Sequence, residues 1–543
     1  MPVARLSRIA STLLVLAGLL AGLLAQAGRP SAAAAEDWPQ WGGRDERNMV
    51  ARESGIPEVF VPGEKKPDGS GIDLRSTSNV RWIARLGSQT YGNPTVAGGR
   101  LVVGTNDFDL ADSRYRSTRG GVVKCLDEAT GKLLWKLVVP RYETNKPGFN
   151  FDCHDLGVCS SPTIDGDRVY LVSSRGEVLC LDVRGMSNGN DGPFRDEAQY
   201  TAGPGRPPIP SGPRDADVLW RFDMIAELPV WPQDAANCSV VIHGDLVYVC
   251  TSNGVDASHD RLPYPLAPTL IALDKRTGRL VAKDDEKIGT RTFHGNWSNP
   301  SLGRVGDKTL LFLGGGDGVC YAFKTLDRVP PGVATLKKVW SFDCLPPHYR
   351  LKDGKPIPYR SGDYRLRRGN TNDGTFLGPS EIIATPAFCD GRVYVAVGQD
   401  TNHGRGRGVL SAIDATRTGD VTATGCLWQY DKIERSISTV AVADGLLYAA
   451  DFAGTLHCLD ARTGSVYWTH ATKTETWSSP FVVDGKVFLG TQKSLWVLAA
   501  GKNKKVLHEI RLGSPVHSTP IAANGVLYVT THRYLWAVQS PKQ

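Results

Sequence analysis

The chain has 543 residues, of which 22% are charged, and its formal net charge at pH 7 is +7. A charge this small and spread along the chain excludes the concentrated basic surface of a nucleic-acid-binding protein. The 59 glycines and 34 prolines favour a turn-rich, all-β protein.

The first 35 residues have the pattern of a secretory signal peptide. Two arginines precede an apolar stretch at 9–25, and small residues follow as far as Ala35. We predict cleavage after Ala35, with Ala27 as the alternative position. The uncleaved stretch could also anchor the chain in a membrane, since it nearly reaches the roughly 20 residues that a span requires. No cysteine precedes Cys125, so we expect no lipid-attachment site in this leader.

After an irregular segment at 36–78, one short phrase recurs eight times: an aliphatic pair, Asp-Gly or a variant, then a β-branched and aromatic run. Each copy predicts two strands joined by a tight turn, because a type I′ turn requires positive φ angles that Gly and Asn adopt easily. The copies lie at 94–103, 162–172, 240–250, 300–313, 386–397, 440–450, 480–490 and 520–530. The last three turn glycines are Gly445, Gly485 and Gly525. The number of residues between successive glycines matches the length of one four-stranded propeller blade.

A second phrase follows many of the hairpins and supplies the third and fourth strands of a blade. It runs from an apolar-Asp pair through Thr-Gly to a strand that ends near a tryptophan, and it is clear at 125–135, 272–282 and 458–468. We interpret the tryptophans of the outer strands as packing between blades and not as stacking on a cofactor. These are Trp82, Trp135, Trp220, Trp340, Trp428 and Trp468.

The eighth copy ends at residue 538 and lacks a fourth strand. Residues 79–86 form a candidate outer strand with no hairpin before it. We predict that this N-terminal strand completes the last blade and removes the open sheet edge. The expected fold is an all-β, eight-bladed propeller of four-stranded antiparallel blades over 79–540, after a signal peptide at 1–35.

The loops expected around the channel mouth are enlarged and hold several aspartates and most of the histidines. No two of these histidines have the spacing of zinc ligands, so we assign no metal site. They are His154, His259, His294, His348, His403 and His470. On the opposite face, the Pro- and Gly-rich linker at 186–217 predicts a mobile or extended excursion.

Small polar residues stand where the inner strand of each blade begins, and they predict a ring around the channel. A steric reading explains their size, because eight converging strands leave room only for small side chains; ligand or cofactor binding is the alternative. The ring consists of Asn93, Ser161, Ser239, Asn299, Thr385, Thr439, Ser479 and Thr519, and Tyr91, Trp297, Trp477 and His517 stand just before four of these.

Eleven cysteines in an exported chain raise the question of disulfides. Cys153 and Cys159 are close enough in sequence to form a bridge within one loop. Cys238 and Cys250 lie on the two strands of one hairpin, where the expected register makes a bridge doubtful. The fold does not depend on either pairing.

The hairpin and the LDxxTGxxxW phrase together resemble the repeat of quinoprotein alcohol dehydrogenase-like eight-bladed propellers, a superfamily that includes the BamB-like outer-membrane assembly factors. The resemblance covers roughly residues 79–540. The opening at 37–43, DWPQWGG, is similar to the start of many secreted PQQ-like repeat proteins of planctomycete-type bacteria. The resemblance implies the fold and a location in the periplasm or cell envelope of a Gram-negative-type bacterium, or secretion.

Catalytic members of that superfamily hold pyrroloquinoline quinone (PQQ) under a vicinal Cys-Cys disulfide, with a tryptophan beneath it and acidic and amide residues around a calcium ion. This sequence has no adjacent cysteines and no CxxCH haem motif. No acid can be assigned as the base that alcohol oxidation requires. We therefore assign no catalytic residue and no cofactor, with PQQ and Ca²⁺ as the alternative.

The sequence thus predicts an exported, non-enzymatic binding or scaffold protein. Its partner would be a protein, a glycan or a small-molecule ligand at the channel-mouth face. Two alternatives stay open: a PQQ-dependent alcohol or sugar dehydrogenase with an unconventional site, and a BamB-like outer-membrane protein assembly factor.

Overall fold

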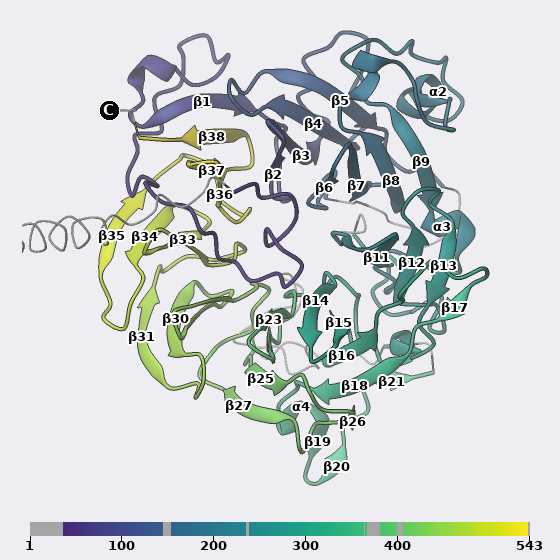
Figure 1. Ribbon diagram of the computed structural model, residues 1–543, viewed down its shortest axis with the longest axis vertical. Helices are drawn as coiled ribbons and strands as arrows, with labels where there is room; N and C mark the ends of the chain where they lie inside the picture. Colours follow the sequence, from purple (N-terminus) through teal and green to yellow (C-terminus); the bar gives the residue numbers. More distant parts are fainter. Residues whose placement is uncertain are drawn as a thin grey trace, which may run out of the picture. The chain divides into compact units, whose positions relative to one another are not determined.

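The computed structural model describes residues 36–144, 152, 154–234, 238–362, 364–365, 381–398 and 406–540. These residues form eight antiparallel blades arranged in a ring as a β-propeller, as the repeats predict (Figure 1). Within the described part of the chain, no helix combines the length and the apolar character needed to cross a membrane.

Each blade is a four-stranded antiparallel sheet, and its strands follow one another from the channel outward. The first four blades are β2 (Thr95–Ala97), β3 (Arg100–Asn106), β4 (Gly121–Asp127) and β5 (Leu133–Val139); β6 (Thr163–Asp165), β7 (Arg168–Val172), β8 (Glu177–Asp182) and β9 (Val218–Asp223); β10 (Val241–His243), β11 (Leu246–Cys250), β12 (Leu270–Asp274) and β13 (Leu280–Lys283); and β14 (Ser301–Val305), β15 (Lys308–Gly314), β16 (Val319–Lys324) and β18 (Lys338–Asp343).

The next three blades are β23 (Ala387–Cys389), β24 (Arg392–Ala396), β25 (Leu410–Asp414) and β27 (Cys426–Tyr430); β28 (Ala441–Ala443), β29 (Leu446–Ala450), β30 (Thr455–Asp460) and β31 (Val466–Ala471); and β32 (Phe481–Val483), β33 (Lys486–Gly490), β34 (Leu495–Ala499) and β35 (Val506–Ile510). Two short strands, β17 (Ala334–Thr335) and β26 (Gly419–Asp420), add in parallel to the outer edges of the third and fourth blades.

The last blade combines β36 (Ile521–Ala523), β37 (Val526–Thr530) and β38 (Tyr534–Val538) with β1 (Val80–Arg85) from the other end of the described chain. β1 pairs antiparallel with β38, and Trp82 lies opposite Ala537. The predicted closure by an N-terminal strand is therefore confirmed, and the outer strand of the eighth blade precedes the seven other blades in sequence.

The hairpin turns explain the recurring Asp-Gly and Asn-Gly pairs. At Asp444-Gly445 and Asn524-Gly525, both central residues have φ between 51° and 75°, which is the pattern of a type I′ turn. This turn matches the right-handed twist of the flanking strands, so the register that buries one face of each strand is set locally.

The six outer-strand tryptophans join neighbouring blades, as predicted. Trp82 Nε1 donates to the Glu128 carbonyl of the next blade at 2.9 Å, and Trp135 Nε1 donates to the Val183 carbonyl at 2.9 Å. The same bond links Trp220 to Lys275, Trp340 to Ala415, Trp428 to Ala461 and Trp468 to Gly501. The glycine of the Thr-Gly phrase packs against the indole: a Cβ on Gly131 would stand 2.5 Å from the Trp82 ring.

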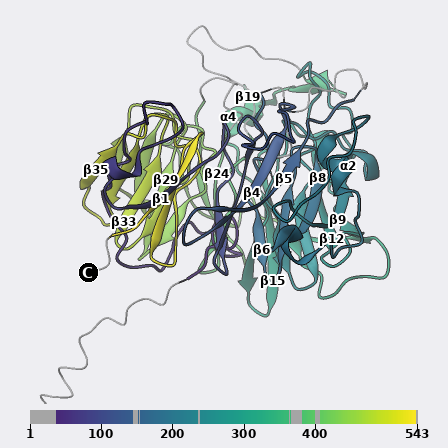
Figure 2. The ribbon, with the colours of Figure 1, turned by 90° about the horizontal axis from the view of Figure 1, so that it is seen from above.

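Several elements lie outside the blades. They are η1 (Leu74–Ser76), η2 (Gly185–Asn188), α2 (Glu197–Ala202), α3 (Met224–Glu227), η3 (Ile288–Thr290), α4 (Pro347–Arg350), β19 (Leu351–Lys352), β20 (Lys355–Pro356), β21 (Arg360–Ser361) and β22 (Tyr364–Arg365). In the side view, α4 and β19 stand beyond the ends of the blade strands (Figure 2). The linker at 186–217 differs from the extended excursion that we expected, because η2 and α2 pack against β5.

The ten described cysteines, Cys238 and Cys250 included, are all free. Cys238 Sγ instead lies 3.3 Å from Ser252 Oγ. Cys153 falls outside the described residues, so the suggested bridge to Cys159 stays a prediction.

Candidate functional site

The segment before β1 crosses the centre of the ring and bonds to the inner strands of one blade after another (Figure 1, dark purple). Main-chain N–H groups of these strands donate to its carbonyls at 2.8–2.9 Å, from Val96 to Trp38, Ile164 to Pro39, Leu302 to Asp45, Phe388 to Glu46 and Val482 to Met49. Asn48 adds a two-way amide bond with Val442, at 2.8 Å in each direction. The segment thus satisfies inner-strand groups that would otherwise face the channel.

Arg47 is the centre of this segment, and its side chain has no exposed surface. The guanidinium donates to the carbonyls of Pro300 at 3.3 Å and Val240 at 2.7 Å, and also to that of Trp41. Burial lowers the pKa of Arg47 to about 10, partly countered by Asp45 and Glu46. Arg47 therefore stays charged at neutral pH and ties the segment to the third and fourth blades.

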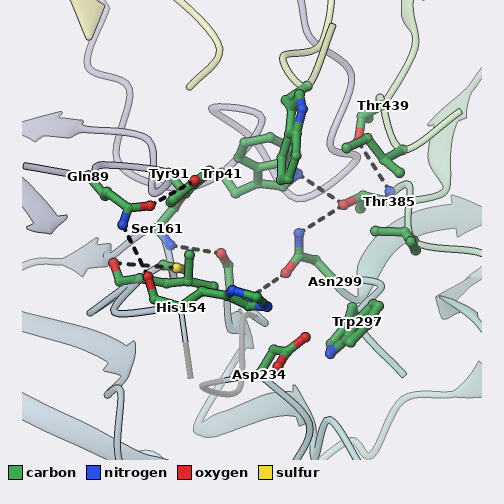
Figure 3. Close-up of a pocket in the computed structure, with 16 residues that line it drawn as sticks. Trp41, Gln89, Tyr91, His154, Ser161, Asp234, Trp297, Asn299, Thr385 and Thr439 are labelled. Atoms are coloured by element: carbon green, nitrogen blue, oxygen red, sulfur yellow. Dashed lines mark hydrogen bonds between the residues drawn. The ribbon is translucent and has the colours of Figure 1, made fainter. Parts of the chain in front are cut away.

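Trp41 forms part of the wall of a cavity of about 530 Å³ at the centre of the ring. Its indole Nε1 donates to Thr385 Oγ1 at 3.0 Å (Figure 3). The rest of the lining comes mainly from the loops that lead into the inner strands, the face that the enlarged loops were expected to surround. The full lining is Trp41, Gln89, Tyr91, His154, Leu156, Cys159, Ser161, Asp234, Ser239, Trp297, Asn299, Ile383, Thr385, Ile437, Thr439 and Trp477.

The predicted polar ring exists as a closed belt of hydrogen bonds. In seven steps the main-chain N–H of one member donates to the side-chain oxygen of the member in the next blade, at 2.5–3.2 Å. The remaining step runs from Asn299 Nδ2 to Thr385 Oγ1 at 3.0 Å. The order is Asn93, Ser161, Ser239, Asn299, Thr385, Thr439, Ser479, Thr519 and back to Asn93.

The belt explains why these positions are both small and polar. An N–H at the entry of an inner strand has no partner in its own sheet, and a buried unpaired group costs about 1–3 kcal/mol. A hydroxyl or short amide on the neighbouring blade supplies the acceptor within the space that the converging strands leave. Five of the eight members (Ser161, Ser239, Asn299, Thr385 and Thr439) also line the cavity; Asn93, Ser479 and Thr519 do not.

Aromatic side chains make up another part of the cavity wall. The rings of Tyr91 and Trp477 lie 5.6 Å apart, and Trp477 stacks on His517 at 4.8 Å with an angle of 11°. His517 lies behind Trp477 and outside the lining, and its Nδ1 is 2.9 Å from His532 Nε2. Burial lowers the pKa of His517 to about 3 and that of His532 to about 4. Both imidazoles are therefore neutral at physiological pH and serve as packing surfaces for Tyr91 and Trp477.

The charges at the cavity are few. Asp234 is the carboxylate among the described lining residues, His154 is exposed, and neither a lysine nor an arginine belongs to that lining. Burial raises the pKa of the Cys159 thiol well above its usual value, so this sulfur is not a thiolate nucleophile. The described wall is aromatic and neutral-polar, with one negative group.

This wall does not fit PQQ. The cofactor carries three carboxylates, and buried anions require cationic or multiple N–H partners. Within the described residues the lining offers no lysine or arginine to pair with these carboxylates. The Trp477 and Trp297 rings supply stacking surfaces, but the thiol of Cys159 has no adjacent cysteine with which to form the vicinal disulfide.

Several functional residues were not found from the sequence. Trp297 and Trp477 line the cavity as members of the predicted set, whereas Trp41, Gln89 and Asp234 were not proposed. The WPQW opening was the available signal for Trp41. Among the loop histidines, His259 and His294 stack on each other, with Nδ1 and Nε2 2.9 Å apart. His403 lies outside the described residues.

Comparison with known proteins agrees with the fold. Residues 72–187 and 406–504 match a family model described as outer membrane protein assembly factor BamB. A europium-containing methanol dehydrogenase is similar over 91% of this chain and 89% of its own, with 14% identity and a TM-score of 0.53. A quinohemoprotein alcohol dehydrogenase from Pseudomonas putida is similar over 93% and 82%, with 12% identity and a TM-score of 0.51.

BamB from Moraxella catarrhalis is similar over 84% of this chain and 99% of its own, with 14% identity and a TM-score of 0.49. No curated protein sequence matches the chain. At these identities the similarity to solved structures concerns the fold, and the chemistry has to be argued from the cavity itself.

Proposed function

We propose that the function of this β-propeller resides in its central cavity, on a fold that it shares with quinoprotein dehydrogenases and on a match to the BamB family model over residues 72–187 and 406–504. The protein is an exported binding protein that takes a neutral saccharide there and catalyses no reaction. The observation that carries the proposal is the composition of the cavity wall: aromatic rings, amides and hydroxyls, with no cation in the described lining.

The size of the cavity supports a small ligand. Its volume of about 530 Å³ falls within the roughly 300–1,000 Å³ of typical small-molecule sites. Such a site binds an oligosaccharide of a few residues, whereas a folded protein partner requires an extended interface.

The chemistry of the wall favours a neutral, hydroxyl-rich molecule. The C–H faces of a pyranose pack against rings such as Tyr91, Trp297 and Trp477, and its hydroxyls need donors and acceptors such as Gln89 and Asp234. Gln89 and the belt oxygens already have hydrogen-bond partners within the chain, so a sugar hydroxyl would add to or replace these bonds. An anionic ligand would lose its hydration without gaining a cationic partner.

A binding role is preferred to catalysis because general acid–base chemistry requires a titratable side chain held against the reacting bond. The carboxylate and the imidazole of the described lining, Asp234 and His154, lie on two different loops, the first half-buried and the second exposed. Export is supported by the leader at 1–35, whose pattern is that of a signal peptide.

The test is calorimetric titration of the mature chain with neutral trisaccharides: maltotriose, cellotriose and chitotriose. One of them should bind with 1:1 stoichiometry. Trp477→Ala should weaken that binding at least tenfold, because it removes a wall of the cavity. Trp496→Ala is the matched control, since Trp496 is a half-buried tryptophan of β34 outside the lining. No heat with any saccharide, or equal losses in both variants, would refute the assignment.

A second candidate, outer-membrane protein assembly, is favoured by the family model that matches residues 72–187 and 406–504. Purification of the tagged protein from envelope membranes of its host tests it. Stoichiometric recovery of a barrel-assembly complex would support this role, and its absence under crosslinking would leave saccharide binding as the function.

A further inference from the structure

Three aspartates gather at the outer side of the second blade, on the insertion between β8 and β9. Asp182 ends β8, Asp191 follows η2, and Asp217 precedes β9. One carboxylate oxygen from each lies within 4.8 Å of the others. Asp182 and Asp217 are buried and Asp191 is exposed, so the cluster opens to solvent on one side.

Asp217 is the member of the cluster that is buried without a hydrogen-bond partner for each of its carboxylate oxygens. Its side chain has no exposed surface. Oδ2 accepts the main-chain N–H of Asp191 at 2.9 Å, but Oδ1 is buried without a hydrogen-bond partner. A buried carboxylate oxygen with no donor is costly unless a cation or a proton compensates it. Burial raises the pKa of Asp217, and the charges of Asp182 and Asp191 raise it further.

Other ligand groups surround the three carboxylates. Asn188 Nδ2 donates to Asp182 Oδ2 at 3.4 Å and also to Asp191. Because the two ends of an amide exchange by a 180° rotation, the same side chain can present its oxygen to this point. Two positive charges lie nearby: Arg184, half exposed, has its Nε 3.5 Å from Asp182 Oδ1, and the charge of Arg195 acts on Asp217.

We propose that Asp182, Asp191 and Asp217, with the Asn188 amide, form a calcium-binding site. The donors are all oxygens and three of them are anionic, which is the chemistry that hard divalent cations require. Neither histidine nor cysteine belongs to the cluster, so zinc is not the expected ion. Calcium is preferred over magnesium because it accepts irregular oxygen ligands, while magnesium demands near-octahedral geometry.

The site would fasten the insertion to the blade. Asp182 N–H donates to the Asp217 carbonyl at 3.0 Å, and Met186 N–H donates to the Asp215 carbonyl at 2.9 Å. Within the insertion, Glu197 accepts the N–H of Val218 at 3.2 Å and the amide of Asn190 at 2.9 Å. A cation bound by all three carboxylates would link Asp182 and Asp217, at the two ends of the insertion, to Asp191 within it. It would also neutralise the repulsion between the three negative charges. This role is independent of the ligand in the central cavity.

The experiment is calorimetric titration of chelator-treated protein with CaCl₂, followed by melting with and without the ion. We expect one calcium ion per chain with a dissociation constant on the order of 10⁻⁴ M, and a higher Tm in calcium. MgCl₂ should bind at least tenfold more weakly.

Two variants locate the site. Asp191→Asn, at an exposed position, should fold normally and weaken calcium binding at least tenfold, and Asp217→Asn should abolish it. Asp167→Asn is the matched control, because Asp167 is an exposed acid in the hairpin of the same blade. Absence of calcium binding by the wild type at millimolar concentration would overturn the proposal, as would binding that both cluster variants retain. In that case Asp217 carries a proton or a water in place of the cation.

Discussion

Replacing Arg47 by methionine tests whether this side chain holds the N-terminal segment across the centre of the ring. The guanidinium is fully buried and donates to three main-chain carbonyls, those of Trp41, Val240 and Pro300. Methionine fills much of the volume but donates nothing, so the carbonyls of Trp41 and Pro300 lose their donor, whereas that of Val240 keeps the Thr163 hydroxyl at 3.2 Å. At about 1–3 kcal/mol for each unpaired group, partly offset because a charge no longer has to be buried, the net loss is about 3 kcal/mol.

The loss should concentrate in the segment itself. Urea unfolding measures the change in stability, and limited proteolysis with mass spectrometry locates new cleavage between residues 36 and 60. Saccharide binding should weaken as well, because Trp41 belongs to the cavity wall.

Arg44→Met is the matched control in the same segment. Arg44 pairs with Glu36 at the surface, with about a third of its side chain exposed, and such a pair contributes about 0–1 kcal/mol. If Arg47→Met matched Arg44→Met in both unfolding midpoint and cleavage pattern, Arg47 would not be what holds the segment in place.

Three further changes test other parts of the account. Thr439→Val removes the belt oxygen that accepts the Thr385 N–H and should cost about 1–3 kcal/mol of unfolding free energy; a loss no larger than that of exposed Thr335→Val would contradict the belt. Truncation after residue 515 removes β36–β38, leaves β1 unpaired and should abolish the cooperative melt of the whole ring, so an unchanged sharp melt would disprove closure. The pKa of His517 is about 3 in the folded chain and about 6.5 in the unfolded chain, so the unfolded chain gains a proton first and the folded state loses stability as the pH falls below 6.5. Between pH 7.5 and 5 the wild type should lose about 2 kcal/mol more unfolding free energy than His517→Gln. Equal losses in the two proteins, measured by urea unfolding at both pH values, would refute the shift.

The ring of blades could be predicted because its determinants are local and repeated. A turn such as Asn524-Gly525 fixes two strands within a few residues, and Trp82 marks the strand that the eighth blade lacks. The predicted polar positions were also found, but their hydrogen bonds were not, since each bond joins residues in different blades, such as Thr519 and Asn93.

The N-terminal segment could not be predicted because its bonds follow no period. Its carbonyls accept N–H groups from residues far along the chain, as Met49 does from Val482. A single buried arginine cannot be distinguished in the sequence from an arginine at the surface. The linker at 186–217 was misjudged for a related reason. Its Pro and Gly content suggests a mobile or extended excursion, while Asp191 and Glu197 hold it through bonds to Asp217 and Val218.

The central claim is that the cavity takes a neutral saccharide and not the quinone of the dehydrogenases that share this fold. Parallel calorimetric titrations of the mature chain, with the three trisaccharides and with PQQ in calcium buffer, test it most directly. We expect 1:1 binding of one saccharide and no heat with PQQ. Stoichiometric PQQ binding that the saccharides do not displace would contradict it.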